Sequence, residues 1–152
     1  MPIYRLALII TLKLASFGLF AHSAAANDTI TVYKTPTCGC CTDWVDHLKA
    51  DGFDVKALDI THQALNQVKR EAGLRPELAS CHTAFVGGYV IEGHVPAADI
   101  RRLLAETPDA LGIAVPGMPM GSPGMEFGDR QDPYAVLLFN KEGQTRIFSQ
   151  YP

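Results

Sequence analysis

Short alternating runs and helically spaced apolar residues divide the chain into successive elements. Residues 29–33 alternate apolar and polar side chains and include β-branched residues, which predicts a strand. The next apolar residues share the i, i+3, i+4, i+7 spacing of one helical stripe: Cys41, Trp44, Val45 and Leu48. Gly52 stands where glycine is favoured after a helix. The pattern predicts a strand followed directly by a helix, with residues 38–41 in the turn and the first helical turn.

The same kind of pattern continues to residue 104. A second strand is predicted over residues 53–60. Two further helices are predicted from spaced apolar residues: Leu65, Val68 and Ala72, ended by Gly73, and Ile100, Leu103 and Leu104, opened by Pro96. Between these helices, residues 83–86 and 89–92 flank Gly87-Gly88, which is a hairpin signal. The resulting order, βαβαββα, is typical of a thioredoxin-like sheet, so the predicted fold class is α/β.

Residues 112–133 have a different composition. Prolines and glycines alternate there, which predicts a Met/Pro/Gly-rich loop. This segment holds every methionine that follows residue 26: Met118, Met120 and Met125. A C-terminal β-hairpin is predicted after it, with strands at 134–139 and 145–148. The chain shows no internal repeat and no second boundary, so residues 27–152 are expected to form one domain.

The first 26 residues predict an export signal. Arg5 precedes an apolar stretch, and Ala24-Ala25-Ala26 closes it with small residues, as in secretory signals. A membrane anchor is the alternative, but Lys13 interrupts the stretch, which is shorter than the ~20 residues of a spanning helix. We therefore expect removal after Ala26, a periplasmic location, and no stable membrane anchor on the remaining chain.

Charge removes nucleic acid from the expected partners. All sixteen acidic residues follow residue 26, whereas Arg5 and Lys13 precede it and leave eleven basic residues, so the remaining 126 residues carry a net charge of about −5. That balance lacks the basic surface that nucleic acid requires. The length is sufficient for one domain with a hydrophobic core.

Four cysteines supply the main chemical clue: Cys38, Cys40, Cys41 and Cys81. In an exported protein, four cysteines ordinarily form two disulfides. Of the three pairings, only Cys38–Cys41 with Cys40–Cys81 avoids a tight link between near neighbours. A purely structural role gives no reason to crowd three thiols within four residues, so soft-metal binding and thiol–disulfide chemistry rank above it.

The predicted place of the thiols, at a helix N-terminus, supports both of these interpretations. Unpaired N–H groups and the helix dipole favour thiolates there. Cys38 and Cys41 have the spacing of a redox C-x-x-C pair, so the competing function is a thiol–disulfide oxidoreductase in which Cys38 attacks and Cys41 resolves. Cys40 complicates that reaction, because a third thiol can capture the mixed disulfide, whereas a metal site gains from an extra sulfur.

Charge favours copper over zinc for such a cluster. Adjacent helical residues point about 100° apart, so Cys40 and Cys41 are not expected to face a single ion together, although sulfurs that bridge several ions escape this limit. Four Cu(I) ions would neutralise four thiolates, whereas one Zn(II) would leave two negative charges. We therefore hypothesise that four thiolates share several Cu(I) ions; one soft ion on two or three cysteines is the weaker form.

Four ordered motifs extend along the chain: residues 33–41 with Trp44 and His47-Leu48, residues 80–84, residues 87–96 and residues 115–126. Together they resemble the CopG-like family of periplasmic copper-resistance proteins over nearly the whole chain after residue 26. The resemblance implies a thioredoxin-like fold, copper bound by the C-x-C-C cysteines and the later Cys-His cysteine, and a part in copper redox handling. The implied ligands are Cys38, Cys40, Cys41 and Cys81.

Other soft or imidazole side chains are weaker metal candidates. Met118 and Met120 carry thioethers suited to Cu(I), but loop methionines often cap a core instead, and Met125 ranks below these two as a ligand. His94, at a strand-to-helix turn, could bind copper or bond to backbone. His82 would point away from Cys81 if the strand has begun there, and His47 lies too far along its helix, so both are expected to be structural or to support a ligand without binding the ion. His62 follows a predicted helix cap at Thr61, and His22 lies in the signal.

The predicted function is a periplasmic copper-binding protein for copper resistance that sequesters Cu(I) and exchanges electrons between copper and thiols, cycling Cu(I) and Cu(II). A copper chaperone, which passes the ion on without net redox chemistry, is a further alternative to the oxidoreductase. Copper ions and other periplasmic copper-handling proteins are the expected partners. The sequence leaves open the number of ions and whether a copper oxidoreductase turns over catalytically.

Overall fold

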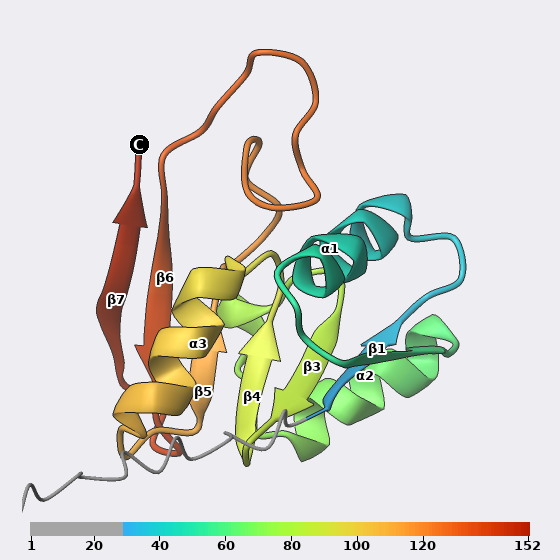
Figure 1. The fold of residues 1–152 in the computed structure, drawn as a ribbon. Coiled ribbons are helices and arrows are strands. Elements are labelled where there is room, and N and C mark those ends of the chain that lie inside the picture. The colour runs from blue at the N-terminus through green and yellow to red at the C-terminus, as the bar shows by residue number, and fades with distance from the viewer. Residues whose placement is uncertain (1–28) are drawn as a thin grey trace, which may run out of the picture.

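A seven-stranded mixed sheet organises the chain (Figure 1). The computed structural model describes residues 29–152, so the predicted export signal lies outside the described residues. From edge to edge the strands are β2 (Val55–Asp59), β1 (Ile30–Lys34), β3 (Thr83–Val86), β4 (Tyr89–Glu92), β5 (Gly112–Ala114), β6 (Tyr134–Phe139) and β7 (Thr145–Tyr151). β1 pairs parallel with β2, β4 pairs parallel with β5, and the other neighbours pair antiparallel.

The helices are α1 (Gly39–Ala50), α2 (His62–Glu71) and α3 (Ala97–Glu106), and a short 3-10 helix, η1 (Pro76–Leu78), follows α2. The order through α3 is the predicted βαβαββα, and the hairpin at Gly87-Gly88 and the C-terminal hairpin are also present. The predicted helix cap is formed, because the Thr61 hydroxyl accepts a 3.2 Å hydrogen bond from the Ala64 N–H. Within residues 29–152, none of the helices combines the length and apolar character that crossing a membrane requires.

The loop prediction for residues 112–133 was wrong at its first three residues, which form β5 between β4 and β6. A strand of this length is too short to display an alternating pattern, and its pairing partners are distant in the sequence. Gly112 is required by the close approach of strand β4: a Cβ at this position would lie 1.9 Å from the Val90 carbonyl oxygen. The loop itself therefore begins after Ala114.

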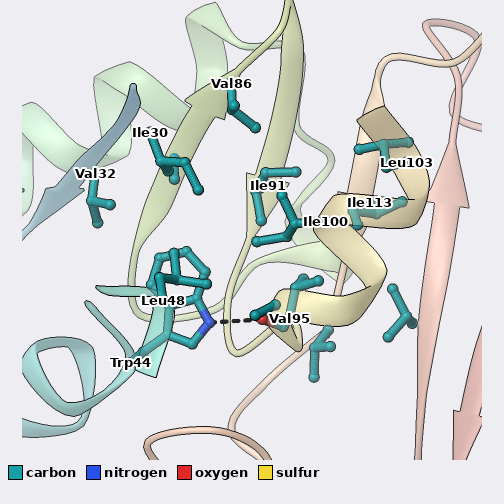
Figure 2. Close-up of a cluster of buried hydrophobic side chains, with 14 of the residues drawn as sticks. Ile30, Val32, Trp44, Leu48, Val86, Ile91, Val95, Ile100, Leu103 and Ile113 are labelled. Atoms are coloured by element: carbon teal, nitrogen blue, oxygen red, sulfur yellow. Dashed lines mark hydrogen bonds between the residues drawn. The ribbon is translucent and has the colours of Figure 1, made fainter. Parts of the chain in front are cut away.

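Two hydrophobic layers cover the sheet. The larger one joins α1 and α3 to one face through Trp44, Leu48, Ile100 and Leu103, and Figure 2 shows these side chains around the strand residues they contact. The Trp44 indole N–H also donates a 2.8 Å hydrogen bond to the Val95 carbonyl. This bond ties the first helix to the segment that enters α3, so the start of α1 is fixed against the sheet by buried contacts.

The opposite face carries a smaller apolar cluster: Leu74, Leu78, Val90, Ala114 and Phe139. α2 packs on the same side, where Lys69 reaches Thr83 and Glu92 at the ends of β3 and β4. One face of the sheet thus carries the larger apolar layer, while the other contains the buried polar group formed by Lys69, Thr83 and Glu92.

Candidate metal centre

The four cysteines gather where β1 leads into α1. Cys38 is the residue that precedes α1, Cys40 and Cys41 lie in its first turn, and Cys81 lies just before β3. All four Sγ atoms lie within 4.8 Å of one another. The Sγ separations are 3.6 Å for Cys38 and Cys40, 4.0 Å for Cys40 and Cys81, and 3.4 Å for Cys41 and Cys81. The structure brings together all four predicted ligands in a group that could hold metal.

Cys38 and Cys41 are joined by a disulfide, and Cys40 and Cys81 are free thiols. The structure therefore contains the cluster in a partly oxidised form. Cys41 is fully buried, while the other three cysteines are partly exposed. Metal binding by four thiolates requires reduction of this disulfide. The oxidised form retains only the Cys40 and Cys81 sulfurs as possible metal ligands.

Cys40 and Cys41, which are adjacent in the sequence, both approach Cys81. Their Sγ atoms lie 4.0 Å and 3.4 Å from that of Cys81. Cys81 approaches the helix start from the sheet and is within reach of both. The expectation that the two side chains do not face a single ion together stays a prediction. A single ion and a multinuclear cluster are both compatible with this arrangement.

A buried polar network fixes the segment that carries Cys81. The Glu92 carboxylate is fully buried and accepts hydrogen bonds from the Ser80 N–H at 2.6 Å and the Thr83 hydroxyl at 2.7 Å. Lys69 forms an ion pair with Glu92 and donates a 2.9 Å hydrogen bond to Thr83. The residues on both sides of Cys81-His82 are therefore tied to one carboxylate. Sequence reasoning missed this network, although Lys69 and Glu92 are charged residues within predicted elements.

Burial raises the pKa of Glu92, while the positive charge of Lys69 and the hydrogen-bond donors act in the opposite direction. Every neighbour that Glu92 contacts in this network is a donor, which matches an ionised carboxylate. Because an unpaired buried charge is costly, Lys69 and Glu92 depend on one another.

His94 presents a ring nitrogen to the cluster. Its Nδ1 lies 2.8 Å from the Pro123 carbonyl oxygen, and its Nε2 lies 3.1 Å from Cys81 Sγ. A carbonyl oxygen only accepts, so Nδ1 carries the proton and the Nε2 lone pair faces the sulfur. Burial lowers the pKa of His94, which favours the neutral ring. A backbone carbonyl that holds the far N–H is the usual support of a metal-binding histidine.

His82 also lies beside Cys81, because the strand that would have turned it away has not yet begun at this residue. Its Nδ1 lies 3.4 Å from Cys81 Sγ. Side chains alternate between the two faces only within a strand, and β3 begins only at Thr83. Cys81 and His82 therefore do not follow this alternation. The ring packs against Trp44, with centroids 4.3 Å apart. Among the buried side-chain nitrogen and oxygen atoms of residues 29–152, His82 Nε2 is the one without a hydrogen-bond partner.

The local environment holds the His82 ring and the Cys81 thiol in their neutral forms. Burial, followed by the proximity of His94, lowers the pKa of His82 well below its usual range. Burial, followed by the negative charge of Cys40, raises the pKa of the Cys81 thiol to about 12. In the metal-free protein Cys81 is therefore protonated at neutral pH, and a metal ion that binds it must displace this proton.

The Pro/Gly-rich loop lies against the cluster. The Ala79 carbonyl accepts a 3.1 Å hydrogen bond from the Gly117 N–H, and the Ser80 hydroxyl donates to the Gly117 carbonyl. Further along, Gly124 approaches the first turn of α1 so closely that a Cβ there would lie 2.6 Å from the Cys40 carbonyl oxygen. The loop therefore contacts both cysteine-bearing segments as well as His94.

The remaining predicted candidates are placed as follows. Met118 is 52% exposed, and Met125 is buried. Met120 lies beside Tyr134 and Tyr151 in a hollow at the end of the loop. Metal binding by Met118 and Met120 stays a prediction. His47 accepts a 3.2 Å hydrogen bond from the Ala97 N–H, which is a structural role.

Comparisons with known proteins place the chain among related sequences and structures. A family model described as "protein of unknown function, DUF411" matches residues 78–125. A search of curated proteins finds no match. Two solved structures are similar to the chain, and both are described as copper resistance protein CopG. Form 2 is 46% identical with a TM-score of 0.76, covering 82% of this chain and 98% of that one. Form 1 is 47% identical with a TM-score of 0.76, covering 82% and 97%.

Proposed function

The chain belongs to the family of copper resistance protein CopG, and from this premise we propose that it confers copper resistance by binding Cu(I) through Cys38, Cys40, Cys41 and Cys81. The observation that carries the proposal is the convergence of four sulfurs within 4.8 Å. His94 adds a neutral imidazole whose lone pair faces Cys81 at 3.1 Å. Thiolate and imidazole donors suit a soft, monovalent copper ion.

Several ions, rather than one, balance the charge of the reduced cluster. Four thiolates confined to a small, partly buried volume repel one another unless their charge is compensated. The structure supplies no cation in hydrogen-bond contact with these sulfurs among residues 29–152; their neighbours are thiols, hydroxyls and imidazoles. Four monovalent ions bridged by the sulfurs would remove the net charge, which is the proposed loaded state.

The disulfide supports a redox role for the same site. Two Cu(II) ions can each accept one electron as the Cys38 and Cys41 thiolates join in a disulfide, so two electrons leave sulfur and two Cu(I) ions form. Cys40, Cys81 and His94 then remain as donors for Cu(I). A thiol or another two-electron reductant must restore the pair. Location in the periplasm after export, and assignment of the βαβαββα portion to the thioredoxin-like class, are parts of the same proposal.

Cys81→Ser tests the shared cluster. This change removes the sulfur that approaches both Cys40 and Cys41, so we expect lower copper stoichiometry and weaker affinity. Anaerobic Cu(I) titration with metal analysis measures both, and X-ray absorption reports sulfur ligands and any short copper–copper distance. Unaltered copper uptake in this variant would contradict the proposal.

A second candidate function, thiol–disulfide oxidoreductase, is favoured by the Cys38–Cys41 disulfide. The same variant distinguishes this function from copper binding by the shared cluster. Exchange through these two cysteines does not require Cys81, so the reduction potential of the pair and its exchange rate with dithiols should be largely retained in Cys81→Ser. Met118→Leu and Met120→Leu serve as companion variants, because a drop in stoichiometry there would add a thioether to the site.

A further inference from the structure

A groove of about 400 Å³ opens onto the cysteine cluster from the side of α2. Cys38 and Cys81 are among the residues that line it. Cys41, by contrast, is fully buried. A molecule in the groove would therefore meet the two sulfurs that belong to different segments of the chain, one from the start of α1 and one from the segment before β3.

Polar side chains from separate elements line the groove, together with the apolar side chain of Leu65. The segment between β1 and α1 contributes Thr35 and Thr37, and α2 contributes His62 and Asn66. These hydroxyl, imidazole and amide groups can hydrogen-bond a polar molecule. The volume lies within the range of pockets that take small molecules and is small for a folded partner.

Another approach to Cys81 is occupied by the chain's own loop. The Gly117 backbone pairs with Ala79, and the Ser80 hydroxyl holds the Gly117 carbonyl. Gly117 therefore occupies the Ala79 carbonyl and the Ser80 hydroxyl beside Cys81, so these groups are not free to bind an extended segment of another protein. This arrangement disfavours a protein chain as the molecule that reaches Cys81 and leaves the α2 groove for a small one.

We propose that this groove binds a low-molecular-weight thiol complex of Cu(I), which delivers the ion to Cys81 and Cys38. The inference rests on the proposed function and adds the chemical class of the copper donor and its route. A soft ion is held in solution by soft ligands, so a small thiolate is a suitable carrier. The polar side chains of the lining bind the body of the carrier while its copper-bearing sulfur faces the cluster.

The transfer is a ligand exchange without electron transfer. The Cu–S bond to the carrier breaks as a Cu–S bond to Cys81 forms. The proton displaced from the Cys81 thiol leaves with the carrier, which departs as a free thiol. Cys38 is the next sulfur that lines the groove, and in the reduced protein it can accept the ion before it enters the buried part of the cluster.

Blocking the groove tests the route. Asn66→Trp on α2 and Thr37→Trp in the segment before α1 each place a large ring in the lining. Gln67→Trp is the matched control, because Gln67 is exposed on α2 and outside the lining. The reduced proteins are mixed anaerobically with the Cu(I) complex of glutathione. We expect both groove variants to load more slowly by about one order of magnitude, within the usual spread of association rates among variants of one interface. The final copper content and the behaviour of Gln67→Trp should match the unmodified protein.

A metal-free measurement accompanies the loading rate. In the oxidised form Cys40 and Cys81 are free, so peptide mapping after brief exposure to iodoacetamide reports the labelling rate of Cys81 separately. It should fall in Asn66→Trp and Thr37→Trp and stay unchanged in Gln67→Trp. Maleimide carried on a large polymer should label Cys81 poorly even in the unmodified protein.

The outcomes separate the two proposals. Full loading at an unchanged rate in both groove variants would overturn the groove, as would equal slowing in Gln67→Trp or faster loading from a copper-bearing protein than from the glutathione complex. Failure of the unmodified reduced protein to take up Cu(I) at all would instead overturn the proposed function.

Discussion

Cys40 in the first turn of α1 and Cys81 before β3 lie 4.0 Å apart at their sulfurs, but different interactions position them. Cys40 belongs to a regular helix whose apolar stripe packs on the sheet. Cys81 lies outside regular structure, on a segment held by the buried Glu92 carboxylate and by the loop around Gly117. One half of the site is therefore set by local sequence, and the other depends on contacts between distant segments.

This difference has an energetic consequence. The start of α1 has no side-chain cap, so its position depends on the buried stripe that includes Trp44 and Leu48 rather than on one polar bond. The segment with Cys81 depends on a few polar contacts, and losing one leaves buried charge or donors without partners. Polar substitutions are therefore expected to damage the Cys81 half far more than the α1 half.

The largest effect is expected from Glu92→Gln. The amide keeps the size of the side chain but leaves the buried Lys69 ammonium without its counter-charge. Removing one partner of a buried ion pair costs about 3–5 kcal/mol. Urea unfolding of the metal-free protein measures the loss, and the labelling rate of Cys81 should rise because the Ser80 N–H loses its charged acceptor.

Thr42→Ala provides the matched change on the α1 side. The Thr42 hydroxyl donates a 3.3 Å hydrogen bond to the Cys38 carbonyl at the exposed helix start. Its removal should cost less than about 1 kcal/mol, the usual net contribution of one hydrogen bond. Equal destabilisation by Thr42→Ala and Glu92→Gln would contradict the distinction between the two halves.

A smaller loss of stability is expected from substituting the loop glycine that contacts α1. Gly124→Ala combines a φ of +82° with a Cβ 2.6 Å from the Cys40 carbonyl oxygen, whereas Gly117→Ala has a φ of +69° and no atom within 4 Å of its Cβ. We expect about 2–4 kcal/mol for Gly124→Ala, from left-handed strain plus overpacking, and about 1 kcal/mol for Gly117→Ala, from strain alone. Thermal unfolding of both variants checks this, and a similar loss in the two would show that the contact with α1 is unimportant.

A pH dependence of stability is expected from His82. Its folded pKa is depressed below the ordinary value of 6.5, so the unfolded chain binds the proton more readily. The stability that His82 contributes is present above pH 6.5 and is lost as pH falls below it, at up to about 1.4 kcal/mol per pH unit. Unfolding of the metal-free protein at a series of pH values should show this decrease, and His82→Phe should show a shallower one.

The informative quantity is the difference in free energy of unfolding between the unmodified protein and His82→Phe at each pH. His94 also has a lowered pKa and acts in the same direction. Glu92 has a raised pKa, so its contribution falls as pH rises above its unfolded value and acts in the opposite direction. Both groups are present in the unmodified protein and in His82→Phe. Identical pH profiles for the two would show that His82 does not remain neutral on folding.

Much of the fold followed from local pattern. The stripe of Cys41, Trp44, Val45 and Leu48 predicted α1 and its buried face, and Gly87-Gly88 predicted the turn between β3 and β4. β5 could not be predicted, because three residues carry no periodic signal and the strand exists only between its two partners. The same limit applied to His82, whose orientation depended on where β3 begins.

The sequence by itself determined that three thiols stand at the start of one helix, because a helix and its first turn are specified by neighbouring residues. Only the tertiary structure decided that Cys81 and the His94 lone pair reach those thiols, and that Lys69, Glu92 and the loop hold them there. These contacts join residues more than ten positions apart. Their geometry is fixed by strand pairing and by the need to satisfy buried polar groups, neither of which is visible in local spacing.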